Sequence, residues 1–211
     1  MADVERPGAQ EWVPDGAGLE ELRSASAECR GCELWKDAEQ VVFSAGQRGA
    51  RIMLVGEQPG DQEDRTGEPF IGPAGRVLDD ALADAGIPRG EAYVTNAVKH
   101  FRHHVRGKRR IHDKPGVAHI EACHPWLDAE MRVISPAVVV ALGATAGRAL
   151  LGRPVRITAE RGALTEGPQG ARVLITTHPS ALLRLRGREG WDEAYDRLVA
   201  DLEIARDAAR A

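Results

Sequence analysis

Arg51-Ile52-Met53-Leu54-Val55-Gly56 is the stretch of sequence that decides the fold. Its apolar run, closed by glycine, is typical of a short strand buried on both faces of a parallel sheet. Similar runs recur at Ala92–Asn96, Ala137–Leu142 and Arg172–Thr177. Helical spacing lies between and after them, at Pro73–Ala85, Val117–Ile134 and Trp191–Ala208. This alternation predicts an α/β fold, a three-layer α/β/α sandwich around a central four-stranded parallel sheet.

The remaining segments are shorter or less regular. We expect helices at Gly18–Cys29 and Ala144–Leu151, and a small strand pair formed by Val155–Thr158 and Gly162–Thr165. Residues 1–16 are polar and contain two prolines, which predicts a loosely ordered arm. A chain of 211 residues is long enough to bury a full core, so we expect one domain over 1–211.

Composition narrows the class of protein. Hydrophobic content of 43% and charged content of 28% are ordinary for a globular chain, and a pI near 6.0 excludes a uniformly basic nucleic-acid coat. We find no apolar run long enough to cross a membrane and no signal peptide. Three cysteines, an odd number, favour metal or cluster ligation over disulfides. We therefore expect a monomeric cytoplasmic protein of the bacterial cytosol and nucleoid, without a membrane partner.

Polar motifs follow the expected strands, where ligands bind in parallel sheets. Gly56-Glu57-Gln58-Pro59-Gly60 follows the first strand, Asn96 ends the second, and His178-Pro179-Ser180 follows the last. The chain lacks the glycine-rich signatures of P-loop and dinucleotide-binding proteins. The α/β pattern therefore does not indicate a nucleotide cofactor.

A basic stretch with a central histidine is the other unusual feature. Residues 99–114 contain seven Lys or Arg and one acid, Asp113, in a chain of formal net charge −4. Such a segment is suited to docking on phosphates, and its His112 could reach nucleic acid as a nucleophile or acid–base group. A solvated basic loop with an incidental histidine is the alternative.

Taken together and in order, these motifs resemble the uracil-DNA glycosylase superfamily, specifically its iron–sulfur family 4. The resemblance covers about residues 25 to 205. It is carried by Cys29-x-x-Cys32, Gly56–Gly60 with Gly67–Gly75, Val94–Lys99 and His178–Arg184. Two departures from family 4 stand out. His100 replaces a cysteine, and the next connection is expanded by Lys108-Arg109-Arg110-Ile111-His112. Both are similar to the UdgX branch, which joins covalently to uracil-containing DNA.

The resemblance implies a metal site. It assigns a [4Fe–4S] cluster to three thiolates and one imidazole, those of Cys29, Cys32, Cys123 and His100. By spacing alone, Cys₃His is equally a structural zinc pattern. Other histidines are rival ligands by proximity, namely His103, His104, His119 and His124. We expect a structural role for the cluster.

The resemblance also implies a uracil pocket. Asn96 would read the polar edge of the base, Phe70 would stack on it, and backbone amides at Gly56 and Gln58 would approach it closely. His178 would donate to uracil O2 as negative charge develops there, an effect worth roughly 3 kcal/mol. Turn capping by Asn96 and core packing by Phe70 are the alternatives.

Glu57 would stabilise the cationic sugar or orient a water or His112. A tethered imidazole could then attack in place of water, an advantage of up to about 7–11 kcal/mol. The expected partner is uracil-containing DNA, preferably single-stranded. Groups expected to contact it are Lys108, Arg109, Arg110, Ser180 and Arg184. Arg110 could instead hold the loop in a closed position. An ordinary family 4 hydrolase and a binding module without chemistry are the competing interpretations.

Overall fold

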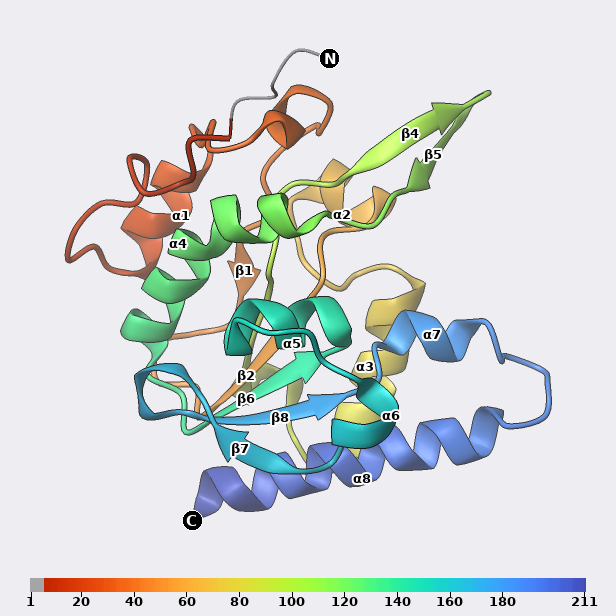
Figure 1. Cartoon of the computed structure of the whole chain (residues 1–211). Helices are drawn as coiled ribbons and strands as arrows, with labels where there is room; N and C mark the ends of the chain where they lie inside the picture. The colour runs from red at the N-terminus through yellow and green to blue at the C-terminus, as the bar shows by residue number, and fades with distance from the viewer. Residues whose placement is uncertain (1–5) are drawn as a thin grey trace.

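The computed structural model of the chain describes residues 6–211 and contains an α/β/α arrangement around a six-stranded sheet (Figure 1). The strand order is β1-β3-β2-β6-β8-β7. The four inner strands pair in parallel, which confirms the expected fold class. The sheet strands are β1 (Ser44–Ala45), β2 (Ile52–Gly56), β3 (Ala92–Asn96), β6 (Val138–Leu142), β7 (Leu164–Glu166) and β8 (Arg172–Thr176).

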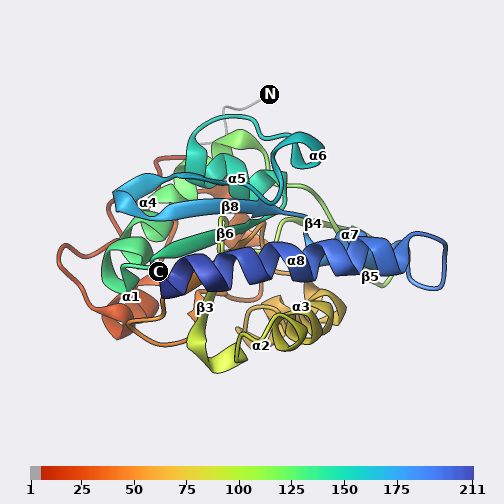
Figure 2. The same ribbon diagram turned by 90° about the horizontal axis from the view of Figure 1, so that it is seen from below.

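Helices cover both faces of this sheet (Figure 2). Side chains alternate along β2, so Met53 and Val55 join one hydrophobic cluster while Ile52 and Leu54 join the other. The first cluster is covered by α1 (Leu19–Ser26), α4 (Val117–Ile134) and α5 (Ala144–Leu151). The second is covered by α3 (Pro73–Asp84), α7 (Pro179–Leu183) and α8 (Trp191–Arg210). The remaining helical elements are α2 (Asp61–Thr66), α6 (Ile157–Glu160), η1 (Glu33–Lys36), η2 (Arg89–Glu91) and η3 (Pro168–Gly170).

The region between α5 and β8 differs from expectation. The strand pair predicted for Val155–Thr158 and Gly162–Thr165 is wrong, because the first segment enters α6 instead. The second segment overlaps β7, which pairs antiparallel with β8 at the edge of the main sheet. Apolar alternation is too short here to distinguish one helical turn from a strand.

The basic segment forms a two-stranded antiparallel hairpin that projects from the body of the molecule (Figure 1). Its strands are β4 (His103–Arg106) and β5 (Arg109–His112). Gly107, with φ 63°, takes the first position of the two-residue connection, a conformation that favours glycine. Pairing places His103 opposite His112 and Val105 opposite Arg110.

The amino-terminal segment is better ordered than the loose arm expected for residues 1–16. The amide of Ala9 donates to the Ala122 carbonyl at 2.7 Å, and that of Gly8 donates to Gly31 at 3.0 Å. Ala9 is only 1% exposed. These contacts hold Gly8 against the loop at Gly31 and Ala9 against α4, and residues 1–5 lie outside the described part of the chain.

A buried ion pair joins the sheet to α4. Lys99 donates to Glu130, and both side chains are almost inaccessible to solvent. Glu130 also accepts hydrogen bonds of 2.8 Å from Tyr93 and from Thr95. The chain leaving β3 is therefore held against α4 before it reaches the hairpin. Among the described residues, we find no helix that is both long and apolar enough to span a membrane.

Candidate functional site

Three predicted residues meet at the carboxyl end of the inner strands. Gly56 and Asn96 end β2 and β3 as paired neighbours. A Cβ atom at position 56 would lie 2.3 Å from Asn96 Oδ1 and 2.5 Å from Phe70 Cζ. Glycine is thus required for the amide and the aromatic ring to come together. Phe70 itself has a φ of 59°, an uncommon backbone conformation for a bulky residue.

Asn96 presents an unused acceptor in this corner. Asn96 is 1% exposed, and its Oδ1 atom is buried without a hydrogen-bond partner among the described residues. A buried acceptor left unpaired costs about 1–3 kcal/mol. An amide held in this way is suited to a ligand that brings its own N–H donor into the site.

His178 stands beside this corner at the start of α7. Its ring centroid lies 6.0 Å from that of Phe70. The Ser180 amide donates to Nδ1 at 3.1 Å, and the Ser180 hydroxyl lies 2.8 Å from the same nitrogen. Burial, followed by the charge of His112, lowers the pKa of His178 to about 4. At neutral pH the ring is therefore uncharged and carries its hydrogen on Nε2, ready to donate.

The structure brings Glu57 and His112 together across the same site. Glu57 Oε1 lies 3.5 Å from His112 Nε2. The other carboxylate oxygen accepts a hydrogen bond from the Thr145 hydroxyl at the start of α5. The His112 ring centroid is 6.1 Å from that of Phe101. The corner formed by Asn96 and Phe70 is thus bordered by the Glu57 carboxylate, the exposed His112 ring and the neutral His178 ring.

The Gln58 side chain is bound at the base of the hairpin, and the approach of its backbone amide to a base stays a prediction. Its Nε2 donates to the carbonyls of Arg102 and Asp113, and its Oε1 accepts from the Arg102 amide, each at 3.1 Å. The side chain is thereby engaged with the chain on both sides of the hairpin. Gln58 supports the base of the hairpin that carries His112.

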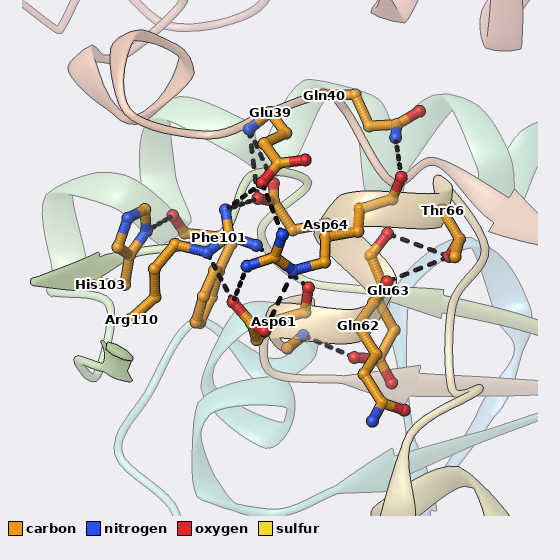
Figure 3. Close-up of polar contacts among 12 residues, drawn as sticks. Glu39, Gln40, Asp61, Gln62, Glu63, Asp64, Thr66, Phe101, His103 and Arg110 are labelled. Carbon is orange, nitrogen blue, oxygen red and sulfur yellow. Dashed lines mark hydrogen bonds and ion pairs between the residues drawn. The ribbon is translucent and has the colours of Figure 1, made fainter. Parts of the chain in front are cut away.

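Arg110 is bound to carboxylates of the protein itself. We expected it to contact DNA, but its guanidinium points into the protein and is 12% exposed (Figure 3). It lies 2.5 Å from both Asp61 Oδ1 and Asp64 Oδ2, and 3.1 Å from Glu39 Oε1. It also lies over the Phe101 ring, 5.6 Å from the centroid. These contacts fasten β5 to α2 and direct the Arg110 guanidinium toward the protein's own carboxylates.

The other expected DNA contacts remain accessible. Lys108 and Arg109 lie exposed at the hairpin tip, and Arg184 is exposed after α7. Ser180 is exposed as well, although its hydroxyl is engaged with His178. Cations on the hairpin and after α7 thus remain free to meet a phosphate backbone.

The expected metal ligands are buried in one region. Cys29, Cys32 and Cys123 are reduced, and each is at most 7% exposed. The Trp126 indole donates a hydrogen bond of 3.3 Å to the Cys29 sulfur, and the Lys99 amide donates one of 3.3 Å to the Cys123 sulfur. No group of three or more His, Cys, Asp or Glu side chains within residues 6–211 is arranged to hold a single metal ion.

Burial controls the protonation of these groups. It raises the pKa of the Cys32 thiol to about 11 and that of Cys123 to about 12, and it lowers the pKa of His100 to about 4. An iron–sulfur cluster is held by thiolates, and in some centres by imidazole as well. The three cysteines and the neutral His100 ring offer these ligand types, and N–H donors to sulfur favour the thiolate form.

The rival histidines have other partners. His104 lies 2.8 Å from Asp113, His119 lies 2.9 Å from Glu33, and His103 stacks on Phe101 at 4.8 Å. His124 is 4.0 Å from Asp128.

Sequence reasoning missed Thr145 and the carboxylates that bind Arg110. Thr145 follows the strand β6 by three residues, at the sheet edge where ligand sites are expected. The rule that ligands bind at the carboxyl ends of parallel strands would have selected Thr145 as a candidate. Nothing in the sequence pairs Arg110 with Asp61 or Asp64, because the contact depends on how the hairpin folds back.

Comparison with known proteins agrees with this geometry. Residues 43–203 match the family model described as the uracil DNA glycosylase superfamily. A type-4 uracil-DNA glycosylase of Thermotoga maritima is 40% identical over 162 residues, covering 76% of this chain and 81% of the relative. The corresponding protein of Pyrobaculum aerophilum is 34% identical over 179 residues, covering 80% and 88%. That of Archaeoglobus fulgidus is 30% identical over 188 residues, covering 85% and 91%.

The depressed pKa of His178 predicts a pH-dependent stability. In the unfolded chain this ring titrates near 6.5, whereas in the fold its pKa is about 4. Its contribution to stability is therefore present above pH 6.5 and is lost as pH falls through 4. Urea unfolding of the parent and of His178→Asn, compared at about pH 7.5 and about pH 4.5, measures this. The parent should lose more unfolding free energy than the variant; equal losses would contradict the assignment.

Proposed function

Because this chain belongs to the uracil-DNA glycosylase superfamily, we propose that it excises uracil from DNA and then joins covalently to the sugar through His112. The observation that carries the second step is the 3.5 Å contact between Glu57 Oε1 and His112 Nε2. That contact lies beside the corner built by Asn96 and Phe70. The basic hairpin thus presents an imidazole to the place where a deoxyribose would lie.

Base recognition follows from the pocket. The unpaired Oδ1 of Asn96 accepts from uracil N3–H, and the amide nitrogen donates to O4. Phe70 stacks on the flipped ring, and the backbone at Gly56 and Gln58 approaches its edge. The neutral His178 donates from Nε2 to O2 as the C1′–N1 electron pair leaves with the base.

The chemistry then divides between two groups. Glu57 stabilises the positive sugar and orients the imidazole through Oε1. The His112 lone pair forms a new N–C1′ bond, the ring passes through an imidazolium that loses its proton to solvent, and the departing uracil takes up a proton. We propose that the resulting N–C1′ bond is not hydrolysed at this site, so that each protein molecule reacts once. We propose membership of the UdgX branch, which is supported by His100 and by the Lys108–His112 string in the hairpin.

Ordinary hydrolysis is the second candidate function. The relatives are named type-4 uracil-DNA glycosylases, and a water held by Glu57 would give that reaction at the same site. In both candidate functions the substrate is uracil-containing DNA. We also propose that the protein is a cytoplasmic monomer and that it prefers single-stranded DNA. Reaction rates on single-stranded and duplex DNA of the same uracil-containing sequence would measure this preference.

We further propose a [4Fe–4S] cluster held by Cys29, Cys32, His100 and Cys123. The buried thiols, their N–H donors and the neutral imidazole support this assignment. When bound, the cluster would supply a crosslink between the amino-terminal segment, the root of the hairpin and α4. It is expected to have a structural role.

The covalent step predicts that His112→Ser abolishes the adduct. A serine hydroxyl is too short to replace the ring, and the vacated space admits water, so free uracil should now accumulate beyond one equivalent. Denaturing gels and uracil release on uracil-bearing single strands measure both products. His104→Ser, an exposed histidine on the same hairpin, is the matched control and should crosslink normally. An adduct that persists in His112→Ser would identify another nucleophile.

The cluster proposal predicts iron in the purified protein. Anaerobically prepared protein should be brown and contain about four iron atoms per chain. His100→Cys should keep the colour, because a thiolate is an equivalent ligand. Metal analysis that finds zinc and no iron would reject the cluster in favour of a structural zinc site.

The hairpin geometry predicts that its cations separate into two classes. Replacing Lys108 and Arg109 with alanine should reduce the slope of log binding constant against log salt concentration by roughly 1–2, because each phosphate contact contributes about 0.7 to that slope. Arg110→Ala should leave that slope nearly unchanged and slow adduct formation at saturating DNA. Salt titrations on uncleavable DNA distinguish them, and an unchanged slope in the double variant would mean that the tip does not face the backbone.

A further inference from the structure

We propose that Thr145 is a positioning residue that fixes the Glu57 carboxylate for the reaction, an inference that rests on the proposed function. The Thr145 hydroxyl donates to Glu57 Oε2. The other oxygen, Oε1, is the one that faces His112 Nε2 at 3.5 Å. One carboxylate thus has one oxygen tied to the protein and one directed at the proposed nucleophile.

The local fold holds Thr145 in place. It lies in the first turn of α5, directly after the inner strand β6, and is 5% exposed. The turn into the helix uses Gly143 at φ 92°, a conformation that favours glycine. A Cβ at position 143 would lie 3.2 Å from the His178 Cβ. The same turn therefore approaches both His178 and the support of Glu57.

A hydroxyl at this position limits how the carboxylate can rotate. Glu57 side-chain exposure is 22%, so water reaches part of the group. Among the described residues, its hydrogen-bonding neighbours are Thr145 on one oxygen and the His112 contact on the other. Without the hydroxyl, the carboxylate gains rotational freedom, and Oε1 faces the imidazole for a smaller fraction of the time. Both sugar stabilisation and orientation of His112 should then weaken.

The experiment removes the hydroxyl with little change of shape. Thr145→Val replaces the hydroxyl by a methyl group, and Thr145→Ser keeps the donor. Single-turnover rates of uracil release and the yield of denaturant-resistant adduct are measured on the same uracil-bearing single strand. We expect Thr145→Val to slow release about ten- to a hundredfold and to lower the adduct yield per uracil released. Thr145→Ser should remain within about threefold of the parent.

A double-mutant cycle separates positioning from a general structural effect. In a Glu57→Gln background, Thr145→Val should change the rate by less than about twofold, because the group through which it acts is already altered. An equal fold loss in both backgrounds, or a Thr145→Ser variant as slow as Thr145→Val, would overturn the proposal. If Thr145→Val melts below the assay temperature, Thr145→Ala takes its place in the same cycle.

The experiments distinguish a failure of the proposed covalent function from a failure of the proposed role of Thr145. A parent protein that releases uracil in excess and forms no adduct would reject the covalent function, while the release rates would still test Thr145. A parent that forms the adduct, with release and adduct yield unchanged in Thr145→Val, would reject the role of Thr145 alone.

Discussion

The buried pair of Lys99 and Glu130 is the interaction on which the arrangement of the site depends. The lysine follows β3 by three residues and the glutamate lies in α4, and their side chains are 1% and 0% exposed. Removing one partner of such a pair costs about 3–5 kcal/mol, because the other charge stays buried without compensation. The Lys99 amide also donates to Cys123. One residue thus connects the pocket strand, the long helix, the proposed cluster and the chain that enters the hairpin.

The central sheet and the corner where Gly56, Asn96 and His178 meet could be predicted from the sequence, because their determinants are local. Continuous apolar runs such as Ile52–Val55 identify strands that are buried on both faces. The polar residues that follow such runs converge at one edge of a parallel sheet, and Gly56, Asn96 and His178 do converge there. The requirement for glycine at position 56 became evident only when the distances to Asn96 and Phe70 were known.

The hairpin and its attachment could not be predicted in the same way. The turn signal at Gly107 was present, but the high charge of the segment favoured the interpretation of a loop. Arg110 illustrates the limit most clearly. Its charge was counted toward DNA binding, yet its partners Asp61 and Asp64 lie more than forty residues away in the sequence. Only the register that places Val105 opposite Arg110 turns that side chain toward α2.

That attachment also changes the electrostatics of the proposed DNA-binding surface. Asp61 and Glu39 are 42% and 48% exposed at their side chains, close to the hairpin that must approach a polyanion. Arg110 neutralises part of this negative charge at short range, so under the proposed function it would favour DNA binding through these carboxylates. Losing it would remove the contacts that fasten β5 to α2. Under the proposed function, the exposed Lys108 and Arg109 at the tip would meet the DNA, while Arg110 pairs with the protein's own carboxylates.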